Sequence, residues 1–267
     1  MTAQSAAIAT ATASPARGGM FLGFGNSLLK ELTEWFRGPR VLIIAGISIA
    51  GAIFMTLIPF IAKATNEADA AGLTSMDPTA NVLLGWTGQT VAFIVVVATM
   101  ALLSSERDRG TLAWSLTNPV SPTSIIAAKF VAAIIMLSAT AVLVPMAVSI
   151  GLATVVYGGP PDLGTVGTVA GLFLMLPAFY VALTIGFGTA IRSTAGVAGA
   201  AFAVMFAPQI LGGLVPIVND LSPTSIGAWA MAVAKGEPAS SLTLVGWLVS
   251  MAVIAVGAKF VFDRQEV

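Results

Sequence analysis

Six apolar runs, each more than twenty residues long, constrain this chain more than any other feature of its sequence. A helix needs about 20 apolar residues to cross a hydrocarbon core of ~30 Å. Charged residues make up only 9% of the chain, against about 25% in soluble domains. The sequence therefore predicts an all-α, polytopic membrane protein with six transmembrane helices. The predicted spans are residues 41–62, 82–103, 125–157, 164–191, 196–218 and 242–262.

Residues 1–20 precede the apolar part of the chain and are rich in Ala, Thr and Ser. They lack a clean apolar core before a cleavage site, as a signal peptide would have, so we interpret them as a disordered cytosolic tail. Residues 21–267 then form a single membrane domain. Its third run is longer than a straight crossing requires, and Pro145 within that run predicts a kink.

An amphipathic segment at residues 26–37 leads into the first span. Leucine and aromatic residues recur there at helical spacing, whereas charged residues, Glu31 among them, fall largely opposite. Gly38-Pro39 then ends the helix. The pattern predicts an interfacial helix that lies in the membrane plane. The alternative is an ordinary amphipathic helix packed on its own protein.

Basic residues are distributed unequally between the two ends of the predicted spans. Lys63 and Lys235 lie at one end. The residues assigned to the other end are Arg17, Lys30, Arg37, Arg40, Arg107, Arg109, Lys129, Arg192, Lys259 and Arg264. Cytoplasmic loops are enriched in Lys and Arg. The sequence therefore predicts a multi-pass protein of the plasma (inner) membrane, with both termini and the connection at residues 104–124 in the cytoplasm.

Ionisable groups are nearly absent from the predicted spans. With Lys129 assigned to the connection before the third span, Lys259 is the charged residue that remains inside an apolar run. Ion-coupled carriers usually need ionisable groups at membrane depth, so uphill transport by this chain would need energy from another subunit. The chain has no Cys, no His and no Gly-x-x-x-x-Gly-Lys-Ser/Thr phosphate loop. We therefore expect no catalytic residue, metal site or cofactor in this chain, and its zero net charge gives no nucleic-acid footprint.

The remaining polar groups in the spans are uncharged. Most Ser and Thr residues there are expected to bond their own backbone or a neighbouring helix. Gln89 and Gln209 are harder to place in lipid, and we predict that they face a protein interface or a transport pathway. Small residues four positions apart predict close helix packing. These pairs are Gly46/Ala50, Gly167/Gly171 and Gly196/Ala200.

A polar connection separates the second span from the third. It begins with Glu106, Arg107, Arg109 and Gly110. Residues 111–116 predict a short helix, which Asn118-Pro119 ends. An exposed Trp114 beside two arginines suits a binding hot spot for a soluble partner. The alternative for Trp114 is an anchor at the lipid headgroups.

The connection also carries a motif. Glu-Arg-Asp-Arg-Gly-Thr-Leu at residues 106–112, followed by Asn-Pro-Val-Ser at 118–121, resembles the cytosolic motif of type-2 ABC transporter permeases. The resemblance extends over most of the chain, since residues 26–37 are similar to the elbow helix of that family. Pro122 departs from the pattern, because the family often has Arg there.

The resemblance implies a six-span permease that exports its cargo and works as a dimer with an identical or homologous second copy. Two copies of a cytosolic ABC ATPase would bind ATP and Mg and supply the energy. A coupling helix within residues 106–116 would dock on the ATPase. The residues implied to make this contact are Glu106, Arg107, Arg109, Gly110, Thr111, Leu112 and Trp114.

Residues 221–236 are similar to the outer re-entrant region of the same family. Leu-Ser-Pro at 221–223 provides a helix start and Gly236 a stop. The pattern predicts a short outer helix at residues 226–233, with Trp229 as a candidate outer gate that caps the pathway at rest. The alternative is a loop helix that simply packs on the spans.

Other classes of membrane protein would need sequence features of their own. A carrier or channel that acts alone would show intramembrane charges or an inverted repeat. A membrane enzyme would need a cluster of acid, base or nucleophile at bilayer depth. A non-transporting membrane partner of an ATPase would carry the same docking segment, so that reading stays open. A charge-free interior is compatible with an apolar or amphipathic cargo.

Overall fold

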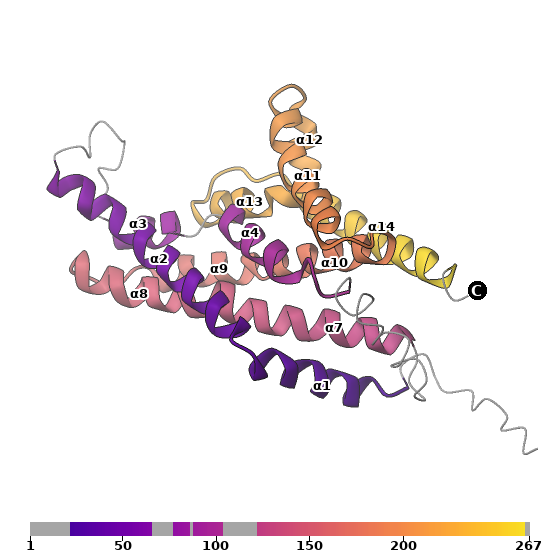
Figure 1. The fold of residues 1–267 in the computed structure, drawn as a ribbon. Helices are drawn as coiled ribbons and strands as arrows, with labels where there is room; N and C mark the ends of the chain where they lie inside the picture. Colours follow the sequence, from indigo (N-terminus) through magenta and orange to yellow (C-terminus); the bar gives the residue numbers. More distant parts are fainter. Residues whose placement is uncertain (1–21, 66–76, 86–87, 104–121, 265–267) are drawn as a thin grey trace, which may run out of the picture.

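The computed structural model describes residues 22–65, 77–85, 88–103 and 122–264. All regular structure in these ranges is helical, and Figure 1 shows most of the long helices running along the molecule, with α11 and α12 inclined to them. The elements are α1 Phe24–Arg37, α2 Arg40–Ala64, α3 Pro78–Gly85, α4 Gly88–Thr99, α7 Pro122–Leu137, the π-helix η1 Ser138–Leu143, α8 Val144–Val156, α9 Leu163–Phe173, α10 Met175–Ala190, α11 Thr194–Gly212, α12 Pro216–Leu221, the 3₁₀ helix η2 Pro223–Ser225, α13 Ile226–Ala234 and α14 Leu242–Asp263.

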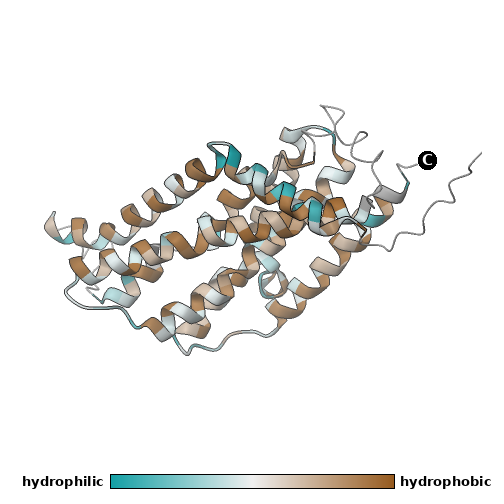
Figure 2. Ribbon diagram, turned by 90° about the horizontal axis from the view of Figure 1, so that it is seen from below, coloured by the Kyte–Doolittle hydropathy of each residue, from teal (hydrophilic) through white to brown (hydrophobic). Residues whose placement is uncertain are grey.

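Six stretches of helix are long and apolar enough to cross a membrane, which confirms the predicted six-span fold. Figure 2 shows apolar residues along the length of the long helices. The spans are Arg40–Ala64, Pro78–Thr99, Thr123–Val156, Leu163–Ala190, Thr194–Gly212 and Leu242–Val261. Because successive spans alternate in direction, α1 and the end of α14 lie at one end of the bundle, called here the terminal end. Helices α12 and α13 belong to the opposite end, called the loop end.

The fifth span is shorter than predicted. Helix α11 ends at Gly212, and residues 216–218 belong to α12 instead. Proline is favoured in the first turn of a helix, where its missing N–H is not needed, and Pro216 begins α12. The prediction of one continuous span at residues 196–218 is therefore wrong at its end.

The third span is the longest helix and is irregular in its middle. It covers 34 residues, which is about 51 Å at 1.5 Å per residue, against a hydrocarbon core of ~30 Å. The π-helical turn η1 lies just before Pro145, which occupies the first turn of α8. Proline has no N–H to donate to the carbonyl four residues earlier, so the regular hydrogen-bond ladder is interrupted there. This π-helical turn lies where the kink was predicted, and the kink itself stays a prediction.

Helix α10 lies at the centre of the bundle. Its Phe179, Tyr180 and Val181 are almost completely buried, and it packs against α4, α7, α11 and α14. In contrast, few residues of α11 and α14 are buried. The apolar side chains exposed on these two helices are available to lipid or to another membrane helix.

Uncharged polar side chains join the spans to one another. Thr184 on α10 donates from Oγ1 to Thr99 Oγ1 on α4 at 2.9 Å. Thr56 on α2 donates from Oγ1 to Ser149 Oγ on α8 at 3.1 Å, and the Tyr157 hydroxyl donates to the Thr56 carbonyl at 2.6 Å. These bonds agree with the expectation that Ser and Thr in the spans mainly bond the backbone or a neighbouring helix.

The closest helix approaches occur at glycines outside the predicted small-residue pairs. A Cβ added to Gly88 on α4 would lie 2.8 Å from the Cα of Gly227 on α13. In contrast, a Cβ on Gly46, Gly167 or Gly171 would meet nothing within 4 Å among the described residues. Among the described residues, the prediction that these three positions mediate close helix packing is therefore wrong, because the spacing of small residues on one helix does not say where another backbone passes.

Gly246 in α14 provides a test of such a contact. A Cβ at this position would overlap the Leu221 carbonyl oxygen, whereas a Cβ on Gly257, in the same helix, would meet nothing within 4 Å. We expect Gly246→Ala to force α14 away from the end of α12 and to destabilise the protein by about 1–3 kcal/mol, as overpacking does. Thermal unfolding of the purified protein in detergent measures the change.

The control for this experiment is Gly257→Ala. We expect it to leave the melting temperature unchanged or to raise it, because Ala is favoured over Gly in a helix by about 1 kcal/mol. Equal melting temperatures for the two variants would show that the contact between Gly246 and Leu221 does not limit packing.

Candidate functional site

The seven residues predicted to contact an ATPase lie outside the described residues. They are Glu106, Arg107, Arg109, Gly110, Thr111, Leu112 and Trp114. The structure does describe the two helices that this segment connects. The chain leaves α4 through the buried Leu102 and Leu103 and enters α7 at Pro122. The assignment of the seven residues stays a prediction from the sequence.

Helix α1 lies against the first part of α7 (Figure 1). Its Glu31 and Trp35 are buried, whereas Leu29 and Phe36 are 66% and 69% exposed. The predicted amphipathic helix before the first span is therefore present, and it packs one face on the protein, as in the alternative interpretation. Its other face keeps apolar side chains exposed, as contact with lipid requires.

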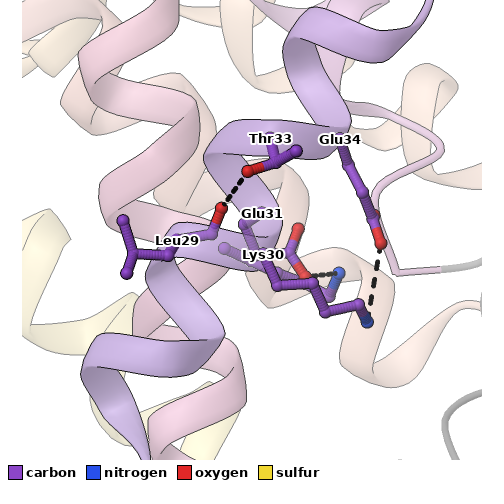
Figure 3. Close-up of polar contacts among 6 residues, drawn as sticks. Leu29, Lys30, Glu31, Thr33 and Glu34 are labelled. Carbon is purple, nitrogen blue, oxygen red and sulfur yellow. Dashed lines mark hydrogen bonds and ion pairs between the residues drawn. The ribbon is translucent and has the colours of Figure 1, made fainter.

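A buried ion pair joins α1 to α7. Lys129 Nζ lies 2.7 Å from Glu31 Oε1, and the two side chains are only 3% and 7% exposed. Figure 3 shows Glu31 and this bond, together with the ion pair between Lys30 and Glu34 on the same helix. The Lys30–Glu34 pair is longer, at 3.6 Å, and about half exposed. Exposed pairs contribute about 0–1 kcal/mol, whereas a buried charge depends strongly on its partner.

The positions of Glu31 and Lys129 correct two inferences from the sequence. Glu31 was assigned to the polar face of its helix, but it follows Leu28 by three residues and precedes Trp35 by four, so it shares their face. Lys129 was assigned to the connection, but it lies inside α7 and is buried. A lysine within an apolar run was the available signal, because such a charge usually has a partner.

A third contact extends this group to the first span. The Arg40 guanidinium carbon lies 4.5 Å from the centre of the Trp35 ring, a cation–π arrangement. Arg40 begins α2 directly after the Gly38-Pro39 link. We call Glu31, Trp35, Arg40 and Lys129 the elbow cluster. It connects α1, the first span and the third span at the terminal end.

Gln89 and Gln209, the two glutamines predicted at an interface or pathway, lie next to each other at the loop end. Gln209 Nε2 on α11 donates to Gln89 Oε1 on α4 at 2.7 Å. Both residues line a cavity of about 360 Å³ between α3, α4, α11, α12, η2 and α13. The structure thus brings the two together across 120 residues of sequence. Their role in a transport pathway stays a prediction.

The predicted short helix near Trp229 is present as α13. Ser222 Oγ accepts a bond from the Thr224 N–H at the start of η2, which leads directly into α13, and Gly236 has a φ of 68° just after the end of α13. Trp229 is half-buried, and its Nε1 is buried without a hydrogen-bond partner among the described residues. Helix α13 packs on α9 and α4. The gate role of Trp229 stays a prediction.

These features define an all-α, polytopic membrane protein in which an amphipathic helix is fixed to the third of six spans. Residues 26–267, all but the first 25 residues, match the family described as ABC-2 family transporter protein. The chain belongs to this family and is a permease, the membrane subunit of an ABC transporter, which works with an ATPase subunit. A comparison with curated proteins finds no significant match.

The buried ion pair can be tested with a double-mutant cycle. We expect Glu31→Gln or Lys129→Met alone to destabilise the protein by about 3–5 kcal/mol, because each leaves a buried charge without its counterion. The double variant Glu31→Gln/Lys129→Met removes both charges and should recover much of that loss. Thermal unfolding of the four proteins in lipid nanodiscs gives the coupling energy.

The matched control is Glu34→Gln, which breaks the exposed pair with Lys30 on the same helix. Its effect should be below about 1 kcal/mol. Strictly additive effects of the two single changes in the cycle would contradict an energetic link between α1 and α7.

Proposed function

We propose that this permease belongs to an ATP-driven exporter and that the ATPase docks on a coupling helix within residues 106–116. A dimer of permeases, identical or homologous, would work with two ATPase copies, and ATP and Mg would bind in the ATPase. The chain itself would hold no nucleotide site. The observation that supports this most is the buried Glu31–Lys129 bond, because it lies on the helix that the docking segment enters.

The length of the third span supports docking at the terminal end. This helix exceeds the hydrocarbon core by about 20 Å, or roughly fourteen residues. If the extra length projects at the terminal end, it presents the first turns of α7 beyond the lipid, and helix α1 of 14 residues packs beside those turns. A soluble subunit could then displace the first turns of α7, which already pack against α1.

The elbow cluster connects the first turns of α7 to α1 and to the first span. Pro122 begins α7 six residues after the docking segment at residues 106–116, so a displacement of that segment would be passed to the third span. Lys129 passes it to α1 through Glu31, and only Gly38-Pro39 separates α1 from α2. Under this proposal, closure of the ATPase would move the first and third spans together.

Sidedness and direction complete the proposal. The excess of Lys and Arg at the terminal end supports a cytoplasmic position for both termini in the plasma (inner) membrane. Helix α13 would then lie near the outer face, where Trp229 caps the pathway at rest. The resemblance supports outward transport, and the small number of charges in the spans is compatible with an apolar or amphipathic cargo.

Two anchor residues of the docking segment test the coupling. Truncating a buried interface anchor typically costs ~2 kcal/mol or more, about thirtyfold in affinity. We expect Trp114→Ala and Leu112→Asp to release or uncouple the ATPase while the six spans stay inserted. Pull-down of the ATPase that co-purifies with the tagged wild-type chain, with ATP turnover measured alongside, records the effect.

A charge variant supplies the control for this test. Arg107→Ala should weaken capture only slightly, since exposed ion pairs contribute about 0–1 kcal/mol each. Full ATPase capture and wild-type turnover in both anchor variants would overturn the coupling-helix assignment.

The proposed sidedness can be tested with single cysteines, because the chain has none of its own. Glu237 and Arg192 are both exposed and lie at opposite ends of the bundle. We expect an impermeant maleimide to label Glu237→Cys in intact cells and to label Arg192→Cys only after permeabilisation. The reverse pattern would place the docking segment outside the cell and contradict the proposed function.

A further inference from the structure

The cavity at the loop end is lined by two chemically different sets of side chains. Polar side chains from four elements form one set, called here the polar wall: Gln89 from α4, Gln209 from α11, Asn219 from α12, and Thr224 and Ser225 from η2. Leu83 and Met231 are among its apolar lining residues. All of the described lining residues are uncharged. Its volume of about 360 Å³ falls within the range of small-molecule sites.

The hydrogen bonds of the polar wall leave one buried donor without a partner among the described residues. Ser225 Oγ donates to Asn219, at 2.7 Å from its backbone carbonyl oxygen and 2.9 Å from its side-chain Oδ1. Gln209 Nε2 donates to Gln89 Oε1. Gln89 Nε2 is buried and has no hydrogen-bond partner among the described residues. Since a buried donor is normally paired, the glutamine is not explained by packing alone.

Tight packing next to the cavity shows that the empty space is not the result of a loose fold. Gly88 precedes Gln89, and its backbone contacts the backbone of Gly227 so closely that a Cβ on either residue would clash. Gly227 in turn follows Ser225 by two residues. The same contact that brings α13 onto α4 therefore holds Ser225 and Gln89 on the wall of one cavity.

We propose that this cavity binds the uncharged, hydrogen-bonding head group of an amphipathic molecule, such as an amide or an alcohol. The amide and hydroxyl side chains match a neutral polar group, whereas an ion would find no opposite charge among the described lining residues. The apolar lining accepts the first carbons of the attached chain. That this molecule is transported cargo rests on the proposed function; that it binds here rests on the cavity.

Photolabelling of the full chain in lipid nanodiscs tests the site without an ATPase. The probe is decanamide with an alkyl diazirine on its chain, compared with diazirine-bearing decane. We expect the amide probe to label cavity-lining residues at least about fivefold more than the hydrocarbon does. Excess unlabelled decanamide should abolish this labelling, and mass spectrometry locates the labelled residues.

Variants of the glutamines separate recognition from general hydrophobic partition. Gln89→Leu and Gln209→Leu should each reduce competed amide labelling by about tenfold, equivalent to about 1.4 kcal/mol. Thr168→Val, at an exposed residue of α9 away from the cavity, should leave labelling unchanged. Melting curves of each variant show that the protein is folded, and either glutamine variant suffices if the other fails to insert.

A change of specificity gives a positive outcome. Gln209→Glu places a carboxylate on the wall and should favour a diazirine-bearing decylammonium over the amide, which the wild-type protein should not do. Equal labelling of the cavity by amide and hydrocarbon, or unchanged amide labelling in both Gln→Leu variants, would overturn the proposal.

The two proposals fail in different ways. Loss of amide specificity with normal ATPase capture would overturn the binding site alone. Specific labelling of the cavity in a chain that captures no ATPase would support the binding site and overturn the exporter function.

Discussion

Polar groups in this bundle must find partners inside the protein, because the hydrocarbon core holds no water to solvate them. The helices meet much of this requirement across their contacts, although Gln89 Nε2 and Trp229 Nε1 have no partner among the described residues. Thr184 bonds Thr99 between α10 and α4, and Trp247 of α14 donates to the Met175 carbonyl at 3.2 Å, beside the break at Leu174. Such bonds select one arrangement of spans that apolar contact alone would leave less specific, since lipid competes equally for apolar surfaces.

The same constraint explains the elbow cluster. A lysine within the third span is tolerated because a carboxylate reaches it at 2.7 Å, and the two charges are removed from solvent together. Replacing such a pair with apolar residues is often neutral for stability, so its value lies in fixing α1 on α7 in one register. Helix α1 is thereby part of the bundle, while its exposed Leu29 and Phe36 are available to lipid.

The sequence predicts local features of this fold better than contacts between distant segments. Six spans are predictable because apolar length belongs to each segment alone, and the stop at Gly236 is a local backbone property. The Glu31–Lys129 bond joins residues 98 apart in sequence, and no periodicity on either helix identifies the partner. Likewise the Gly88–Gly227 contact depends on where two backbones cross, which the small-residue spacing at Gly167 does not reveal.

The candidate site shows the same division. Two glutamines in apolar runs were conspicuous in the sequence, because lipid offers them no partner, but their mutual bond and the shared cavity arise only from the packing of α4 on α11. The docking residues, such as Leu112 and Trp114, were found through a motif and lie outside the described residues, so their role stays a prediction. For these residues the structure adds the two helices that their segment connects, α4 and α7, and the packing of α1 on α7.

Helix α4 links the two regions that the proposals concern. Near one end, Thr99 bonds α10 just before the chain enters the docking segment. At the other end, Gln89 bonds α11, and Phe93 stacks on Phe202 of α11 with ring centres 5.2 Å apart. A helix is stiff along its axis, so a displacement applied to α4 near Thr99 would reach Gln89 at its other end. Under the proposed function, movement of α4 would therefore shear its contacts with α11 and change the polar wall of the cavity, which would couple ATPase closure to cargo affinity without a charge among the described residues that line the cavity.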